Sequence, residues 1–147
     1  MFASVFVLIV SVLLFAYWFR YTCLLILSTE SARDYTRPVA DANGLCFLQA
    51  RETLSADVSA LAFQELRRSL DRDFRLVTYL LRNAGTEDGQ EMEHVILRID
   101  YRLMRIWYGV SRLLSVSAAR KALLEQATII AHLANAMGER SERAAHA

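Results

Sequence analysis

The N-terminal 27 residues, MFASVFVLIVSVLLFAYWFRYTCLLIL, carry a single charged side chain, Arg20. An uncharged apolar run of 18 residues extends from Phe2 to Phe19. That length is typical of a transmembrane helix, because about 20 apolar residues span the hydrocarbon core of a bilayer. A cleaved signal peptide would begin with positive charge and end at a small-residue cleavage site, and this segment has neither. We therefore expect residues 1–27 to be an uncleaved signal anchor.

A polar collar follows the apolar run. It consists of Tyr17, Trp18, Arg20 and Tyr21. Aromatic rings of this kind gather at the level of the lipid headgroups, and an arginine there extends its guanidinium toward water. The collar is thus predicted to mark the membrane interface at the C-terminal end of the anchor.

The arginines near the anchor predict its orientation. Arg20, Arg33 and Arg37 all lie on its C-terminal side, and no arginine or lysine precedes it. The positive-inside rule then puts the N-terminus outside and the rest of the chain in the cytoplasm. The two cysteines, Cys23 and Cys46, form no CxxC pair and fit a reducing compartment. We expect the inner, cytoplasmic membrane of a bacterium.

The rest of the chain is predicted to be helical. It holds the chain's one proline, Pro38, and glycine is scarce, while no segment alternates apolar and polar residues as a strand would. The expected fold class is all-α: one transmembrane helix followed by a long antiparallel helical hairpin or a three-helix bundle. We assign 28–43 to a linker, 44–138 to the cytoplasmic hairpin or bundle, and 139–147 to a flexible tail.

Two long amphipathic helices account for most of this domain. The first is expected over about 45–83, where apolar residues recur at intervals of three and four. The second begins near residue 88 and has the most regular pattern in the chain, which predicts a coiled-coil seam of a and d positions. That seam consists of Met92, Ile96, Ile99, Leu103, Ile106, Val110 and Leu113. It weakens at 114–120, where a bend or a new helix is expected to begin at Ser115 or Ser117.

An arginine pattern, R-x3-R-x2-R-x6-R, occurs once in each long helix with an offset of 30 residues. The members are Arg68, Arg72, Arg75 and Arg82 in the first helix, and Arg98, Arg102, Arg105 and Arg112 in the second. Spacings of three, four and seven keep each set on one stripe of its helix. A hairpin that turns near 86–87 would bring Arg75 level with Arg98, and Arg68 level with Arg105.

These arginines admit two interpretations. A solvated helix face with local ion pairs is the more economical, because Asp71, Asp73 and Asp100 are within reach and such pairs are common. Alternatively, they form a basic band that faces a protein partner or anionic lipid. The near-neutral net charge of +1 argues against a nucleic-acid partner. The 16-to-one excess of arginine over lysine fits a GC-rich genome and indicates no function.

Trp107 and Tyr108 are the candidate interface anchors. They lie beside the predicted seam, next to Gly109. They either widen the core-facing side of the helix or insert into a partner, because tryptophan and tyrosine are favoured at the centres of interfaces.

No catalytic or metal-binding pattern accompanies these features. His94, His132 and His146 lack further ligands at helical spacing, and a metal site needs three or four convergent ligands. Nucleophile elbows and glycine-rich phosphate loops are also missing from the sequence. We expect neither an enzyme nor a cofactor.

The expected function is that of an accessory, scaffolding or assembly subunit of a larger membrane complex. Two long amphipathic helices cannot bury wide apolar faces on each other alone, so a third helix or a partner subunit is needed. The alternative is a self-associating coiled-coil tether that contacts anionic lipid through its arginine-rich face. The expected partners are membrane lipid and protein, either other subunits or a second copy of the chain.

Overall fold

The computed structural model describes residues 2–29, 33–56, 62–84 and 91–146, and in those ranges every regular element is a helix. The all-α expectation is thereby confirmed. The chain divides into two compact units, Met1–Glu30 and Ser31–Ala147. The helices are α1 (Phe2–Ser28), α2 (Thr36–Asn43), α3 (Phe47–Ser55), α4 (Phe63–Asn83), α5 (Glu91–Leu114) and α6 (Val116–His146).

Helix α1 makes up the first unit. Its segment Ala3–Ser28 has a mean hydropathy of 2.0 and is long and apolar enough to cross a membrane. The 27 residues of α1 correspond to an axial length of about 40 Å. This exceeds a hydrocarbon core of about 30 Å, so a spanning α1 would tilt or extend beyond the core. Tyr17, Trp18 and Tyr21 have exposed side chains near its C-terminal end.

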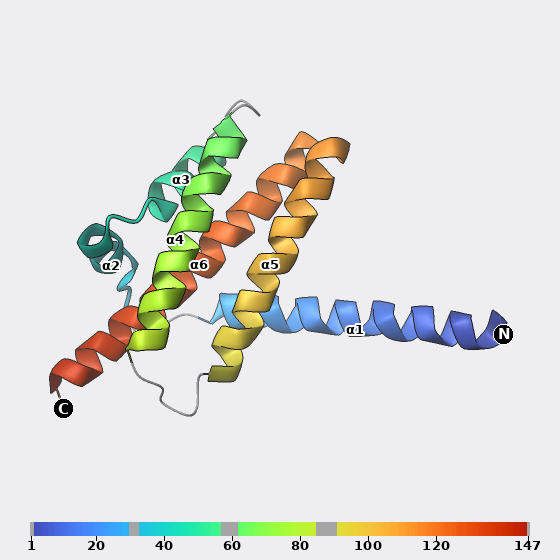
Figure 1. Ribbon diagram of the computed structural model, residues 1–147, viewed down its shortest axis with the longest axis horizontal. Coiled ribbons are helices and arrows are strands. Elements are labelled where there is room, and N and C mark those ends of the chain that lie inside the picture. Colours follow the sequence, from blue (N-terminus) through green and yellow to red (C-terminus); the bar gives the residue numbers. More distant parts are fainter. Residues whose placement is uncertain (1, 30–32, 57–61, 85–90, 147) are drawn as a thin grey trace. The chain divides into compact units, whose positions relative to one another are not determined.

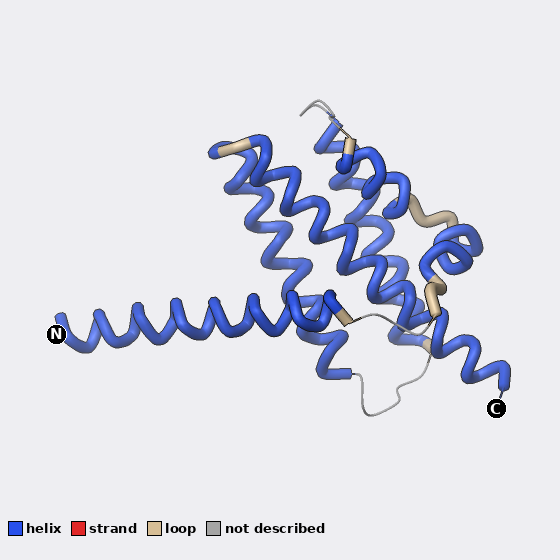
Figure 2. Tube along the Cα trace, turned by 180° about the vertical axis from the view of Figure 1, so that it is seen from behind, coloured by secondary structure: helices blue, strands red, loops and turns tan. Residues whose placement is uncertain are grey.

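A three-helix bundle forms the centre of the second unit. Helices α4 and α5 run antiparallel, and α6 turns back to pack against both (Figure 1). The short helices α2 and α3 pack on α6, and α3 also contacts α4 (Figure 2). Helix α6 therefore touches all four of the other helices described in this unit.

Helix α6 can occupy this central position because many of its buried residues are small. Alanines on several sides of the helix are buried, which lets neighbouring backbones come close; they include Ala119, Ala122, Ala127, Ala131 and Ala134. The predicted break at 114–120 is present at Ser115, between the end of α5 and the start of α6. Beyond this break α6 continues for 31 residues and supplies the third helix of the bundle.

Side-chain pairs between α4 and α5 fix the register of the hairpin. The ring centroids of Phe74 and Tyr101 are 3.7 Å apart, and the Arg67 guanidinium lies 5.4 Å from the centroid of the Tyr108 ring. The Tyr101 hydroxyl donates to Asp71 Oδ1 at 3.1 Å. This register differs by about two residues from the predicted one, which put Arg75 level with Arg98 and Arg68 level with Arg105.

The first long helix is interrupted, contrary to the prediction of one helix over 45–83. Helix α3 ends at Ser55, Ala56 is extended, and α4 begins at Phe63. The predicted apolar positions Val58 and Leu61 lie outside the described residues.

The buried Asp73 carboxylate explains why α3 begins where it does. Its Oδ2 accepts a hydrogen bond from the Cys46 backbone N–H at 2.6 Å, at the N-terminus of α3. A carboxylate there satisfies a free N–H and complements the positive end of the helix. The sequence prediction missed this contact because it joins residues 27 positions apart.

The segment 28–43 is more than the predicted linker, because α2 occupies Thr36–Asn43. Pro38 lies in the first turn of α2, where a missing N–H is tolerated. The helix ends at Gly44, which adopts the left-handed conformation with φ 60°, as glycine does readily at this position.

The segment 139–147, predicted to be a flexible tail, is helical as far as His146. Gly138 lies inside α6 and does not end it, because its role is to permit close packing. A Cβ added at Gly138 would lie 2.3 Å from Tyr35 Cβ. Beyond it, Glu142 accepts hydrogen bonds from the Tyr35 hydroxyl and from Arg33 Nη1, which ties the end of α6 to the segment before α2.

Among the described residues, Gly109 and Gly138 both lie inside helices, and an alanine is expected to have opposite effects at the two positions. Gly138→Ala should lower the free energy of unfolding by about 1–3 kcal/mol, because the new methyl group must displace Tyr35. Gly109→Ala should raise it by about 0.5–1 kcal/mol, because a Cβ there meets no atom within 4 Å and alanine favours helix. Chemical unfolding of the two variants in mild detergent, monitored by circular dichroism, measures the change in the free energy of unfolding for each. Equal effects would show that Tyr35 does not pack on Gly138.

Candidate interaction surface

Helix α5 has two faces with heptad spacing, and they point in opposite directions. The buried face consists of His94, Leu97, Asp100, Tyr101, Met104, Tyr108 and Ser111. His94, Tyr101 and Tyr108 of this face each follow a residue of the predicted seam by two positions. Two positions correspond to a rotation of about 200° around a helix. The predicted aliphatic seam is therefore on the other side, turned away from α4 and α6.

We call this side of the helix the outward stripe. Its members are Met92, Val95, Ile99, Leu103, Ile106, Val110 and Leu113. Met92, Ile106 and Leu113 are 71%, 67% and 81% exposed. Trp107 and Leu114 of α5 lie beside the stripe, and both are exposed. The seam residue Ile96 is half-buried.

The predicted seam therefore does not face the core of the bundle. The core-facing side of α5 instead relies on aromatic rings whose polar atoms have partners. Tyr101 is 2% exposed and stacks on Phe74 while its hydroxyl donates to Asp71. The second oxygen of Asp71 lies 3.5 Å from Arg105 Nε. These contacts hold one face of α5 against α4 and leave the aliphatic face free.

Contiguous exposed apolar residues of this extent are uncommon on soluble monomers and mark sites of interaction with proteins or membranes. In the outward stripe the residues repeat with intervals of four and three from Ile99 to Leu113. That repeat is the seam geometry of a helix that packs against another helix. The arrangement can thus accept a partner helix along most of α5.

One border of the stripe is basic. Arg98, Arg102, Arg105 and Arg112 each precede a seam residue by one position, so they lie about 100° to the same side of it. Arg102, Arg105 and Arg112 are exposed, and Arg98 is half-buried. A partner that covers the stripe would meet positive charge along this edge.

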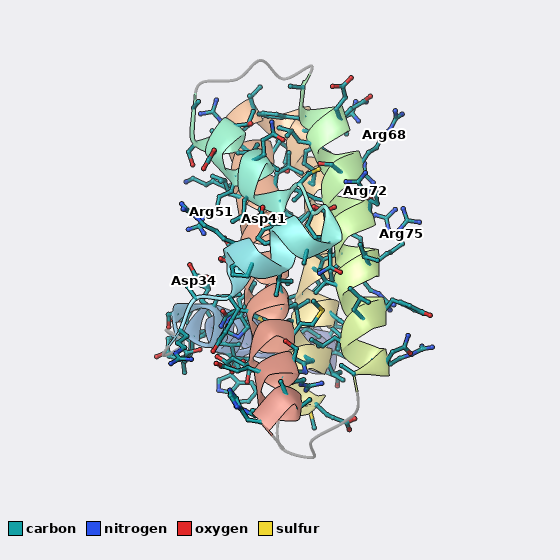
Figure 3. All side chains as sticks on the ribbon, turned by 90° about the vertical axis from the view of Figure 1, so that its left-hand side faces the viewer. Asp34, Asp41, Arg51, Arg68, Arg72 and Arg75 are labelled. Carbon is teal, nitrogen blue, oxygen red and sulfur yellow. The ribbon has the colours of Figure 1, made fainter. Side chains whose placement is uncertain are left out.

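The arginines of α4 form a separate edge. Figure 3 shows Arg68, Arg72 and Arg75 projecting from one side of α4, and Arg82 is also exposed. Some of the predicted local pairing is present: Arg72 Nη2 lies 3.4 Å from Asp73 Oδ1, and Arg75 Nε donates to the Asp71 carbonyl oxygen. Whether either set of arginines faces a partner or lipid stays a prediction.

The two candidate anchor residues lie on different faces. Trp107 is 49% exposed at the edge of the outward stripe, whereas Tyr108 is 2% exposed and packs under Arg67. Adjacent positions on a helix are about 100° apart, so both cannot occupy one interface. Trp107 alone is placed to contact a partner, and Tyr108 widens the core.

No family model, no curated protein and no solved structure matches this chain.

Proposed function

We propose that this chain is a non-enzymatic, single-pass membrane protein that serves as an accessory, scaffolding or assembly subunit of a larger membrane complex. In this proposal α1 anchors it with the N-terminus outside, and the 31–147 unit stands on the cytoplasmic side. The observation that carries the proposal is the outward stripe of α5.

The energy available at the stripe supports a docking role. Seven aliphatic side chains there, Met92, Ile99, Leu103, Ile106, Val110, Leu113 and Leu114, are each at least 42% exposed. Burying the exposed parts of these seven side chains in an interface would contribute on the order of 7 kcal/mol to the free energy of association, at roughly 1 kcal/mol each. Loss of rotational and translational freedom offsets part of this, and a membrane-anchored partner reduces that loss because both molecules are already confined.

A second candidate is self-association, with the stripes of two copies pairing as a coiled coil. The four-three spacing of the stripe favours it. The basic edge would then remain at the side of the coiled coil, where it can contact anionic lipid headgroups. The chemistry of the stripe is the same in both proposals, and only the identity of the covering helix differs.

The test uses the full chain, isolated in mild detergent from the membranes in which it is made. We expect it to migrate as part of a larger assembly. Leu103→Glu combined with Ile106→Glu should release it as a monomer with unchanged helical content, because both side chains are exposed. Gln64→Glu, at an exposed position of α4, is the matched control and should leave the assembly intact.

A photo-crosslinker in place of Leu103 distinguishes the two candidates. A product of twice the chain mass of 16.7 kDa supports self-association, and a product with another protein that is lost in the double glutamate variant supports the subunit role. If the unmodified chain is a monomer without any crosslink, both proposals are wrong.

A further inference from the structure

Three arginines beside the outward stripe of α5 form a row of like charges. Arg98, Arg102 and Arg105 are separated by four and three positions, so they are neighbours on one side of the helix. For Arg102, the residues three and four positions away in either direction are two arginines and two isoleucines, Ile99 and Ile106. Like charges at these spacings repel each other and destabilise a helix. A partner that brings negative charge to this row would offset that repulsion.

Contacts inside the bundle hold two of these arginines from behind. Arg98 Nε donates to the His94 carbonyl oxygen at 3.4 Å, and Arg105 Nε lies 3.5 Å from Asp71 Oδ2. Nε is the guanidinium nitrogen nearest the chain, so in both arginines the two Nη amino groups lie further from the backbone than this contact. These guanidinium groups are thus positioned before a partner arrives, which reduces the ordering cost of binding.

The two borders of the outward stripe differ in chemistry. On one border Arg98, Arg105 and Arg112 repeat at intervals of seven positions, which correspond to about 10.5 Å along the helix. On the other border Trp107 and Leu114 are 49% and 74% exposed. A helix that packs along the stripe therefore meets positive charge on one side and apolar surface on the other.

A second copy of α5 would not match the basic border. The acidic residues of α5 are Glu91, Glu93 and Asp100. Asp100 is fully buried, Glu93 Oε1 lies 2.9 Å from His132 Nε2 of α6, and Glu91 precedes the first residue of the stripe. Two paired copies would bring two arginine rows to the interface without a row of carboxylates between them. The charge of the border thus favours a different helix.

We propose that the helix which covers the outward stripe is amphipathic, with a carboxylate at about every seventh residue on one border of its apolar seam and apolar residues on the other. The inference rests on the proposed function, which requires a docked helix but leaves its chemistry open. Pairs of opposite charge beside a helical seam determine partner choice and orientation. An arginine fork also donates two hydrogen bonds to one carboxylate, so this border selects glutamate or aspartate.

Two synthetic helical peptides test the proposal. Each has the length of α5, 24 residues, and a leucine and isoleucine seam with the spacing of the stripe. One border is glutamate in the first peptide and lysine in the second. The full chain, separated from its assembly and held in mild non-ionic detergent, is titrated into each labelled peptide, and binding is followed by fluorescence anisotropy. We expect the glutamate peptide to bind about tenfold more tightly at low salt, and the preference to shrink at about 0.5 M sodium chloride.

Charge reversal at one arginine tests whether the border makes this selection. Arg102→Glu should remove the preference for the glutamate peptide, because the central positive charge of the row becomes negative. Arg51→Glu is the matched control, since it makes the same change in net charge at an exposed position of α3, a helix that packs on α4 and α6. It should leave the preference unchanged. Leu103→Glu combined with Ile106→Glu disrupts the seam and measures binding to the detergent alone.

The other outcomes contradict the acidic border in different ways. Equal binding of the two peptides, above that measured with the disrupted seam, would overturn it and leave the proposed function standing, because a helix still docks. No binding above that level would overturn both. Equal loss of preference in Arg102→Glu and Arg51→Glu would replace it with diffuse attraction. Tighter binding of a peptide of residues 91–114 of this chain would overturn it and identify a second copy as the occupant.

Discussion

Tyr101→Ala is expected to lower the free energy of unfolding by about 3–5 kcal/mol, whereas Ile106→Ala should lower it by less than about 1 kcal/mol. Tyr101 is enclosed by the bundle, stacks on Phe74 and donates to Asp71, so its removal leaves a cavity and removes the donor to Asp71 Oδ1. Ile106 is 67% exposed, and truncating it removes little buried area. Chemical unfolding in mild detergent, followed by circular dichroism, measures both values.

Tyr101→Phe separates the ring from the hydroxyl. It should cost about 1 kcal/mol, the usual contribution of one hydrogen bond, since the stacking on Phe74 survives. If Ile106→Ala proves as destabilising as Tyr101→Ala, the aliphatic stripe belongs to the core of the bundle and the proposed docking surface does not exist.

The free energy of unfolding should fall by about 3 kcal/mol as the pH is lowered from 6.5 to 4, because of the titration of His94 alone. Burial, followed by the charge of Arg140, lowers the folded-state pKa of His94 from 6.5 to about 4. Within that window the unfolded chain binds a proton at His94 and the folded chain does not. Protons therefore favour unfolding, and the loss grows as the pH falls toward the folded-state pKa.

The groups around His94 define the control for this prediction. Glu93 and Arg98 lie near it on α5, and Arg140 and His132 on α6. His94→Gln keeps a hydrogen-bond acceptor for Arg140 but does not titrate. The difference in unfolding free energy between the unmodified chain and His94→Gln should narrow as the pH falls from 6.5 to 4. Parallel curves for the two proteins would contradict a buried, neutral His94.

Local periodicity predicted most of the helices but not the orientation of α5. The spacing of apolar residues located the long helices, and the seam weakening located the break at Ser115. Helix α5, however, carries heptad repeats on two opposite faces, and only the aliphatic one is apolar throughout, because the other includes His94, Asp100 and Ser111. A hydrophobicity pattern alone would predict that the aliphatic face packs in the core. In the structure the opposite face is buried, because Tyr101 and Tyr108 contact Phe74, Asp71 and Arg67 of α4.

The remaining differences also come from contacts between distant residues. Asp73 defines the start of α3 through the Cys46 N–H. Gly138 resembles a helix stop in sequence, yet it continues α6 because Tyr35 occupies the space beside it. Arg140 lies in the segment that was expected to be a flexible tail, yet its Nη2 is 3.1 Å from His94 Nδ1 of α5. Contacts between residues so far apart in the sequence cannot be predicted from the local spacing of apolar residues.

The proposed function requires that the outward stripe of α5 is covered in the membrane and bare in the isolated chain. Cysteine labelling tests this, using a chain in which Cys23 and Cys46 are replaced by alanine. Ile106→Cys should react quickly with a maleimide in the monomer, once a harsher detergent has separated it from its assembly, and slowly in native membranes, because its partner then covers it. Gln64→Cys should react equally in both. Equal reactivity of Ile106→Cys in the two settings would contradict the proposal, because it would mean that nothing docks on this face of the helix.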